Sequence, residues 1–404
     1  MSDPRRIVII GAGLGGATAA ATLREQGYPG EIVVLGTENH RPYELPPLSK
    51  AVLLGAADEP DWVRDEGFYR EHEVDLRLGT TAVRIERGAR LVVDDRGGEH
   101  TYDRLLLATG SSPRALPGAP DVRTLRTIDD SLSLRDAFSR AQRVVIIGAG
   151  WIGTEAAAAA RRHGADVTVV EQAAAPLLPV LGPEIAGVFQ DLHTENGVHW
   201  KLGTGVAEVS AGTVRLTDGT LLRADLVLVA IGAAPRVDLA HAAGLDLADD
   251  GGVAVDATLH TSAPDVFAVG DIASHYHQHY GKRVRVEHWA NAKNQGAHVA
   301  ANLLGADQPY LRSPYFFSDQ YALGCEYRGL ANVDTDQLVV RGDLAKREFL
   351  AFWLRLGHVV AAMNVNIWDA GDALAALVDG QLPATPEQLR ESDLSALAES
   401  ASGR

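Results

Sequence analysis

The sequence predicts an α/β fold with two Rossmann-like nucleotide-binding domains and a C-terminal α+β domain. Three observations carry this prediction: two Gly-rich fingerprints, a β-branched strand before each of them, and an aromatic-rich stretch after residue 306. At 404 residues, 46% of them hydrophobic and 22% charged, the chain has room for two or three globular domains. The fingerprints read Gly11-Ala12-Gly13-Leu14-Gly15-Gly16 and Gly148-Ala149-Gly150-Trp151-Ile152-Gly153.

Each fingerprint has the spacing of a dinucleotide site. The first glycine allows a tight turn, the second lets the backbone approach a diphosphate, and the third lets the helix pack on the strand. The diphosphate then lies at the helix N-terminus. Because the chain carries two such fingerprints, it predicts two dinucleotides bound at once, which indicates electron transfer.

The elements around the two fingerprints repeat. In the first half the pattern predicts a strand at 7–10, a helix at 17–26 and a strand at 31–35. In the second half it predicts a strand at 144–147, a helix at 154–163 and a strand at 166–170. The repeat indicates duplication of a nucleotide-binding fold.

A later strand in each half ends on small residues. The first ends in Ala108-Thr109-Gly110 and the second in Ala230-Ile231-Gly232. Small residues at the carboxyl end of a parallel strand let a cofactor approach the backbone, and their parallel placement favours this role over a simple turn. A further strand at 265–270, followed by Asp271, returns the chain to the first nucleotide domain.

We expect the first nucleotide domain to be interrupted by the second. The segments are 1–107 and 235–305 for the first domain, 108–234 for the second, and 306–404 for the C-terminal domain. In the last of these, aromatic runs at 315–317 and 349–354 predict strands. The Ser-, Ala- and Glu-rich end from 392 to 404 is expected to fray.

Composition excludes several classes of function. The formal net charge of −16 argues against a nucleic acid or an anionic membrane surface as a partner. No apolar run reaches membrane-spanning length, and the stretch between Met1 and the first strand leaves no room for a leader, which predicts a cytoplasmic protein. The single cysteine, Cys325, cannot form an internal disulfide and is expected to be a small buried residue rather than a nucleophile.

An acidic residue at the end of the second strand of each half sets the nucleotide preference. Glu171 directly follows the strand at 166–170. A carboxylate there binds ribose hydroxyls and repels a 2′-phosphate, so the sequence predicts NADH rather than NADPH; the alternative is a solvated strand end. In the first half the acid is displaced, and Thr37 or Glu38 is expected to bind the ribose.

Three histidines alternate along the run His275-Tyr276-His277-Gln278-His279. On a strand they would share one face, as the ligands of a metal do, but no cysteine or nearby carboxylate completes a ligand set. We therefore expect a surface loop here and no metal.

Four motifs together resemble one family. They are the run from Arg41 to Lys50 (Arg-Pro-Tyr-Glu-Leu-Pro-Pro-Leu-Ser-Lys), the Ala108-Thr109-Gly110 strand end, the second fingerprint, and Val269-Gly270-Asp271. Over essentially its whole length the chain resembles the FAD-dependent, NADH-using ferredoxin reductases of bacterial oxygenase and cytochrome monooxygenase systems, the putidaredoxin reductase group, which share the glutathione reductase-like fold. Two positions depart from the family pattern: Leu45 replaces a common arginine, and Phe317 replaces tryptophan in an aromatic-Ser-Asp-Gln-Tyr signature.

The resemblance implies roles for residues around the flavin. Lys50 would lie beside flavin N5 and stabilise negative charge on the reduced ring. Glu155 would lie near the nicotinamide and Lys50, the alternative being an acid that only complements the helix dipole. Trp151 would cover the flavin face until nicotinamide arrives. The other FAD contacts implied are Arg41, Val83, Arg126, Asp271 and Trp289, with a core position as the alternative for Val83 and an apolar cover as that for Trp289.

The same resemblance implies an oxidoreductase that passes electrons from NADH through FAD to a two-iron two-sulfur ferredoxin, which feeds a cytochrome monooxygenase or another oxygenase. The ferredoxin contact would be transient and steered by a basic patch. Alternatives are a flavin-bound NADH-sensing or assembly protein similar to apoptosis-inducing factor, a rubredoxin reductase, and an NADH oxidase. The residues from which the basic patch would be drawn are Arg64, Arg70, Arg312, Arg328, Lys346 and Arg347.

Overall fold

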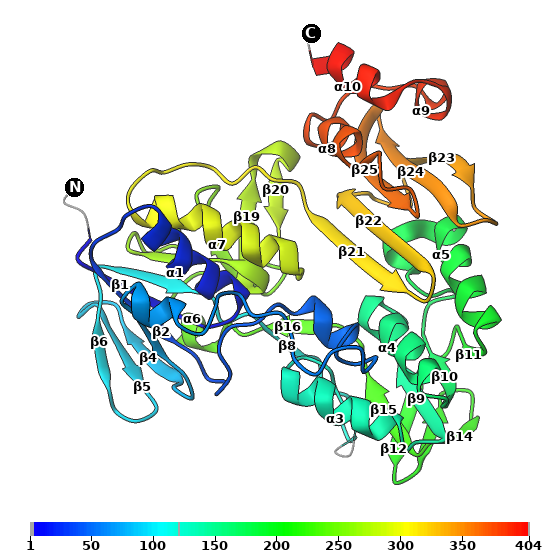
Figure 1. Cartoon of the computed structure of the whole chain (residues 1–404), viewed down its shortest axis with the longest axis horizontal. Helices are drawn as coiled ribbons and strands as arrows, with labels where there is room; N and C mark the ends of the chain where they lie inside the picture. The colour runs from blue at the N-terminus through cyan, green and yellow to red at the C-terminus, as the bar shows by residue number, and fades with distance from the viewer. Residues whose placement is uncertain (1–3, 120–121, 403–404) are drawn as a thin grey trace. The chain divides into compact units, whose positions relative to one another are not determined.

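The computed structural model describes residues 4–119 and 122–402, which form two compact units (Figure 1). Unit 1 comprises the chain up to Leu45, Pro60–Ser112 and Ala233–Arg312, and unit 2 comprises Pro46–Glu59, Pro113–Gly232 and the chain from Ser313. The predicted absence of a leader falls partly on residues 1–3, which lie outside the described residues. No helix in the described ranges combines the length and apolar character needed to cross a bilayer.

Unit 1 holds the first fingerprint in a parallel sheet with the strand order β18-β7-β1-β2-β3. The apolar side chains at 7–10 are all buried, as is typical of a parallel strand covered on both faces. The register aligns Ile7 with Ile32 on one side and Val8 with Leu105 on the other, which confirms the predicted strand–helix–strand unit. The strands are β1 (Arg6–Ile10), β2 (Glu31–Leu35), β3 (Val74–Arg77), β7 (Arg104–Leu107) and β18 (Val266–Ala268).

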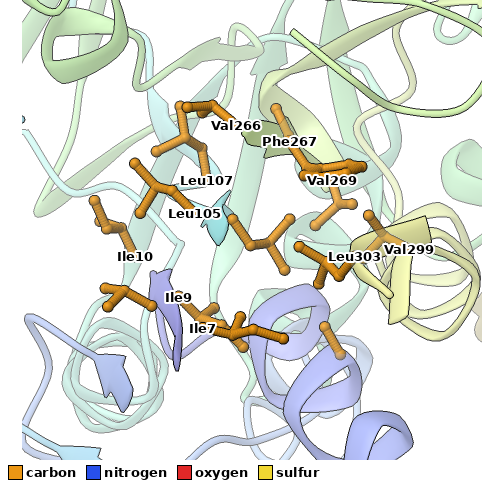
Figure 2. Packing of buried hydrophobic residues seen from close by; sticks show 14 of the residues in the cluster. Ile7, Ile9, Ile10, Leu105, Leu107, Val266, Phe267, Val269, Val299 and Leu303 are labelled. Atoms are coloured by element: carbon orange, nitrogen blue, oxygen red, sulfur yellow. The ribbon is translucent and has the colours of Figure 1, made fainter. Parts of the chain in front are cut away.

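Two helices of unit 1, α1 (Leu14–Glu25) and α7 (Trp289–Leu303), pack against each other (Figure 1). Glycines permit this approach, because a Cβ on Gly296 would overlap the carbonyl oxygen of Gly15. Figure 2 shows the apolar core between the sheet and α7, with side chains from β1, β7, β18 and α7 gathered around one another. Gly15 is therefore a helix-packing position within the fingerprint.

Smaller elements complete unit 1. They are the helices α2 (Phe68–Glu71) and α6 (Asp238–Ala242), the 3-10 turns η2 (Gly270–Ile272) and η3 (Gln278–Tyr280), the sheet of β4 (Ala82–Glu86), β5 (Leu91–Asp94) and β6 (Glu99–Thr101), the sheet of β17 (Val253–Val255), β19 (Ala273–His277) and β20 (Lys282–Val284), and the paired strands β8 (Ser111–Pro113) and β16 (Ala233–Pro235).

The surface loop predicted for the alternating histidines is wrong. His275 and His277 lie on β19 and are 1% and 0% exposed, with their rings against Tyr310 and Tyr280. Burial lowers the pKa of His275 to about 4, because a charged imidazole loses its hydration there. Among the described residues no group of three His, Cys, Asp or Glu side chains is placed to hold a metal ion.

Unit 2 repeats the arrangement around the second fingerprint, with the parallel strand order β11-β10-β9-β15. Helix α4 begins at Trp151, before the predicted start at Thr154, because Gly150 inside the fingerprint is already its N-cap. The elements are η1 (Pro46–Ser49), α3 (Ile128–Phe138), β9 (Arg143–Ile147), α4 (Trp151–Arg162), β10 (Asp166–Val170), α5 (Leu178–Glu195), β11 (Val198–Lys201), β15 (Leu226–Val229) and the antiparallel β12 (Val206–Ser210), β13 (Thr213–Leu216) and β14 (Leu221–Arg223).

The rest of unit 2 is an antiparallel sheet with the order β21-β22-β25-β24-β23, flanked by helices. The strands predicted at 315–317 and 349–354 lie in β21 and β24, and Cys325 is buried on β22 as expected. The elements are β21 (Tyr315–Gln320), β22 (Leu323–Gly329), β23 (Gln337–Asp343), β24 (Glu348–Arg355), β25 (His358–Val365), α8 (Gly371–Asp379), α9 (Pro386–Glu391) and α10 (Leu394–Ser402).

The fraying predicted for the C-terminal end is wrong for residues 394–402. They form α10, whose Leu394 and Leu397 are buried in a cluster with Leu374 and Leu377 of α8. The spacing of its apolar residues on one helical face explains why this segment folds against α8 despite its small and polar composition. Residues 403–404 of the predicted fraying end lie outside the described residues.

Candidate functional site

The Gly-rich turn between β1 and α1 gives its glycines separate tasks. Gly11 has a φ of 113°, and a Cβ there would overlap the carbonyl oxygen of Ala108. A Cβ on Gly16 would overlap the carbonyl oxygen of Gly11, whereas a Cβ on Gly13 would have no atom within 4 Å. Gly13 is the N-cap of α1 and faces open space. Packing within the protein therefore requires the outer glycines but not Gly13.

In the turn between β9 and α4, packing again requires the outer glycines but not the middle one. A Cβ on Gly148 would overlap the carbonyl oxygen of Ala230, and one on Gly153 would overlap that of Gly148. Gly150, the N-cap of α4, again has no atom within 4 Å of a Cβ position. Each turn thus leaves a helix N-terminus with backbone N–H groups beside open space, which fits the diphosphate of a dinucleotide.

Glu171 lies against the second Gly-rich turn. Its carboxylate accepts hydrogen bonds from the N–H of Ala149 at 2.8 Å and from the N–H of Ala173 at 2.9 Å. These bonds fix the carboxylate beside the turn that caps α4; its binding of ribose hydroxyls stays a prediction.

In unit 1 the corresponding strand end lies against the first turn, because a Cβ on Gly36 would meet the side chain of Ala12 at 2.5 Å. The exposed residues that follow have protein partners. The Tyr43 hydroxyl donates to Glu38 at 2.6 Å, and the Thr81 hydroxyl donates to that of Thr37 at 3.3 Å. Both candidate ribose ligands are thus at the predicted turn.

The small residues at the two strand ends contact the Gly-rich turns, and their backbone continues into the chain crossings between the domains predicted from the sequence. The hydroxyl of Thr109 donates to the carbonyl of Arg236 at 2.7 Å, and the N–H of Arg236 donates to the carbonyl of Gly110 at 2.9 Å. In unit 2, Ile231 is 37% exposed and Gly232 has a φ of 94°. The structure therefore brings each fingerprint and its small-residue strand end together.

Two more predicted FAD contacts lie in unit 1. Asp271 is buried in η2 and accepts a hydrogen bond from the Ser111 hydroxyl at 2.6 Å. The neighbouring N–H of Gly270 donates to the side chain of Gln295 on α7 at 2.8 Å, which fixes the turn. Arg41 holds its guanidinium 4.2 Å from the centre of the Trp62 ring, a cation–π contact.

Lys50 and Glu155 form a buried ion pair in unit 2. The Nζ atom of Lys50 lies 2.7 Å from Oε1 of Glu155, and their side chains are 16% and 4% exposed. Lys50 directly follows η1, and Glu155 lies on α4 just after the second fingerprint. The structure thus brings the two predicted catalytic residues together, and each compensates the charge of the other away from water.

Two serines without a predicted role complete the surroundings of Glu155. The hydroxyl of Ser318 on β21 donates to Oε1 at 2.6 Å, and the hydroxyl of Ser49 donates to Oε2. These partners lie 163 and 106 positions away in the sequence, so no local pattern predicts the contacts. The sequence offered one indication of their importance: Ser49 lies in the run from Arg41 to Lys50 and Ser318 in the aromatic-Ser-Asp-Gln-Tyr signature, both of which resemble the family.

Trp151, at the start of α4, packs within unit 2. Its ring centre lies 4.7 Å from that of Phe316 on β21 and 5.7 Å from that of Phe189 on α5. The next residue, Ile152, is 42% exposed. The expected cover of a flavin face by Trp151 stays a prediction.

The remaining predicted FAD contacts lie on separate elements. Arg126 precedes α3, and its N–H donates to Asp130 at 3.0 Å. Trp289 begins α7, with Nζ of Lys293 4.9 Å from its ring centre. Val83 is 54% exposed on β4, so the alternative of a core position is wrong.

Comparisons with known proteins agree along nearly the whole chain. A family model described as pyridine nucleotide-disulphide oxidoreductase matches residues 5–296, and one described as reductase C-terminal matches 315–398. The chain is 40% identical over 402 residues to the ferredoxin–NAD(+) reductase component of an anthranilate 1,2-dioxygenase system from Burkholderia cepacia, which covers 96% of this chain and 97% of that protein. It is 37% identical to the putidaredoxin reductase of Pseudomonas putida over 404 residues, covering 96% and 95%.

Solved structures give the same result. The covalent putidaredoxin reductase–putidaredoxin complex matches with a TM-score of 0.94 and 35% identity over 100% of both chains. The ferredoxin reductase for the CYP199A2 system from Rhodopseudomonas palustris matches with a TM-score of 0.93 and 37% identity over 98% of this chain and 100% of that chain. The chain therefore belongs to the pyridine nucleotide-disulphide oxidoreductase family, as an FAD- and NAD(H)-using oxidoreductase of the ferredoxin reductase group.

Proposed function

We propose that this protein is the reductase of an oxygenase system and passes electrons from NADH through FAD to a two-iron two-sulfur ferredoxin. One observation carries the proposal: the buried Lys50–Glu155 pair lies where the second fingerprint opens into α4. A cation held beside a nucleotide-binding turn stabilises negative charge on a bound cofactor. Cys325 is the single cysteine of the sequence, so a cysteine pair takes no part in the electron path.

We also propose that residues 1–107 and 235–305 hold FAD, that 108–234 bind NADH, and that 306–404 form the C-terminal domain. In support, the first fingerprint and Asp271 lie in unit 1, whereas the second fingerprint and Glu171 lie in unit 2. The segment Pro46–Glu59 groups with unit 2, so Lys50 meets the proposed NADH-binding part although it precedes that part in the sequence.

In this scheme the backbone N–H groups at the starts of α1 and α4 bind the two diphosphates beside Gly13 and Gly150. Glu171 binds the ribose hydroxyls of NADH, and Thr37 or Glu38 binds those of FAD. The other proposed contacts are Gly11, Gly15, Gly16, Arg41, Val83, Ala108, Thr109, Gly110, Arg126, Gly148, Trp151, Ile152, Gly153, Ile231, Gly232, Asp271 and Trp289.

FAD, when bound, accepts two electrons together and releases them singly, which suits a donor of two electrons and an acceptor of one. Lys50 supplies a positive charge whose place is fixed by its bond to Glu155. Glu155 balances that charge, so the pair stays buried without leaving an unpaired ion. Trp151 packs against Phe189 and Phe316 at the start of α4, which fixes the position of its ring.

The contact with ferredoxin would be transient and electrostatically steered, because turnover requires release. Five of the six cations of the predicted basic patch lie within 4 Å of a carboxylate: Arg64 of Glu25, Arg70 of Glu71, Arg328 of Glu326, Lys346 of Asp343 and Arg347 of Glu195. Exposed ion pairs are weak, and the side chains of Arg70 and Lys346 are exposed, so an acidic partner competes for these two cations at little cost. We place the reaction in the cytoplasm, where NADH is regenerated.

The test is an anaerobic stopped-flow experiment in which the yellow protein is mixed with NADH or with NADPH and then with a two-iron two-sulfur ferredoxin. Loss of flavin absorbance within milliseconds to seconds with NADH, followed by ferredoxin reduction, is the expected result. Reduction over minutes with a change of assembly state would favour the NADH-sensing alternative. Fast NADH consumption by oxygen without ferredoxin would favour an oxidase, and transfer to rubredoxin alone would favour a rubredoxin reductase.

A further inference from the structure

A row of buried hydrogen bonds continues from Glu155 away from Lys50. Ser318, which donates to Glu155, also accepts a bond from the amide nitrogen of Gln320 at 3.0 Å. The amide oxygen of Gln320 lies 2.7 Å from Nε2 of His193 on α5. Ser318, Gln320 and His193 are each no more than 1% exposed. We call these three residues the β21 array.

The bonds of the β21 array all run in one direction. The amide nitrogen of Gln320 donates to Ser318, so its oxygen accepts, and Nε2 of His193 must carry the proton. Burial lowers the pKa of His193 to about 4, so the ring is neutral near pH 7. With its oxygen already accepting from Gln320, the Ser318 hydroxyl directs its own hydrogen to Glu155. Aligned donors polarise one another, and this row ends on the carboxylate.

Glu155 therefore receives donors on both oxygens. Oε1 accepts from Ser318 and Lys50, and Oε2 accepts from Ser49. Hydrogen bonds to the charged form of a carboxyl group oppose its protonation. Without them, burial would favour the neutral acid and leave the Lys50 ammonium without its counter-charge.

Two ionisable groups interact with Glu155 from the elements packed around it, Lys50 after η1 and Cys325 on β22. Burial raises the pKa of the Cys325 thiol, the charge of Glu155 raises it further, and Lys50 lowers it. Cys325 therefore stays neutral, and Lys50 supplies the charge opposite Glu155. Asp319, beside Ser318, also acts on Cys325.

We propose that Ser318 and Gln320 are positioning residues that, together with Ser49, hold Glu155 in its charged form and turned toward Lys50. The C-terminal sheet then fixes the charge state of the pair. The importance of the Glu155 charge for electron transfer rests on the proposed function. The hydrogen bonds of the β21 array do not, because they are observed within unit 2. Packing alone does not require the polar side chains of Ser318 and Gln320, because alanine and leucine would fill these two positions without burying polar groups.

The test follows Glu155 directly by infrared spectroscopy of the oxidised flavoprotein at pH 8 and at pH 5. The difference between the wild-type and Glu155→Gln spectra assigns the bands of this carboxyl group. In the wild type we expect carboxylate bands at both pH values. In Ser318→Ala part of the carboxylate band should be replaced at pH 5 by the band of a protonated acid, because one hydrogen bond to the charged form is lost. Ser318→Thr keeps the hydroxyl and should restore the wild-type spectrum.

Ser274→Ala is a matched control, because that serine is also fully buried and donates to a carboxylate, Asp250, at 2.9 Å in unit 1. It should leave the Glu155 band unmoved. Gln320→Leu removes the next hydrogen bond of the array, and it should change the Glu155 bands at pH 5 in the same direction by less. This variant also serves if Ser318→Ala does not fold.

A folded Ser318→Ala or Gln320→Leu protein that keeps the wild-type Glu155 carboxylate bands at pH 5 would overturn the proposal, with folding judged by circular dichroism and thermal unfolding. The infrared result is independent of turnover. If Glu155→Gln leaves flavin reduction by NADH unchanged, the proposed role of the pair in function fails, but the infrared bands still decide whether the β21 array sets the charge of Glu155.

Discussion

Lys50 Nζ and Glu155 Oε1 lie 2.7 Å apart although the two residues are separated by 105 positions of sequence. The lysine comes from the turn after η1 and the glutamate from α4, so the contact ties the segment Pro46–Glu59 to the proposed NADH-binding part of unit 2. Because both side chains are largely buried, each charge depends on the other. The pair therefore links folding and the electrostatics of the site.

Replacing Lys50 by methionine should slow flavin reduction by NADH roughly 10- to 100-fold, because a positioned charge is lost. The variant should also unfold at a lower temperature, since Glu155 keeps a buried charge without its partner. The double variant Lys50→Met/Glu155→Gln should regain stability but not rate. Stopped-flow absorbance and thermal unfolding measure the two effects, with the exposed Lys282→Met as control. A wild-type reduction rate in Lys50→Met would remove this lysine from the mechanism.

Glu171→Arg should move the nucleotide preference from NADH toward NADPH by at least about tenfold in the ratio of kcat/KM values. The carboxylate is held beside the turn by two backbone N–H groups, and an arginine there removes the repulsion of a 2′-phosphate. Steady-state kinetics with both nucleotides measures the ratio. Glu184→Arg makes the same charge change at an exposed position of α5 and should leave the ratio unchanged. If Glu171→Arg also leaves it unchanged, the ribose acid lies elsewhere.

Much of the fold was predictable because its signals are local. Gly16 and Gly153 are required by contacts with Gly11 and Gly148 of their own strand–turn–helix units, so the local pattern indicates them. Gly11 and Gly148 meet the ends of later strands, but they belong to the same short motifs. Ser49 and Ser318 could not be given their role in this way, because their contacts with Glu155 depend on how distant segments fold together.

The errors have physical causes as well. The surface loop was expected for the alternating histidines because no cysteine or carboxylate completes a metal site, but the imidazole rings of His275 and His277 pack against Tyr310 and Tyr280 in the interior. The helix at 394–402 was missed because its small and polar composition is typical of a mobile end. The spacing of Leu394 and Leu397 was the signal that would have found it.

Gly296→Ala should destabilise the protein by about 1 to 3 kcal/mol, because its new Cβ would overlap the backbone of Gly15 and force α1 and α7 apart. Thermal or urea unfolding measures the loss. Gly187→Ala, at a helical position of α5 where a Cβ meets no atom within 4 Å, is the matched control. Alanine there should be neutral or stabilise by up to about 1 kcal/mol, since it lowers backbone entropy in the unfolded chain. Equal effects of the two variants would contradict the close helix packing.

The stability of the protein should fall as the pH is lowered from about 6.5 toward 4, in part through His193. Burial lowers the pKa of His193 from 6.5 to about 4 in the folded state. Between these values the unfolded chain binds a proton that the folded protein does not, so acid favours unfolding; below pH 4 both states are protonated and this contribution no longer changes. The pKa difference corresponds to at most about 3 kcal/mol.

The free energy of unfolding in urea, measured from pH 7.5 to pH 5, should depend less steeply on pH in His193→Gln than in the wild type. Some slope should remain, because burial also lowers the pKa of His275 to about 4. Equal slopes in the two proteins would show that His193 takes up its proton in the folded state as readily as in the unfolded chain, and would refute the neutral, Nε2-protonated ring that donates to Gln320.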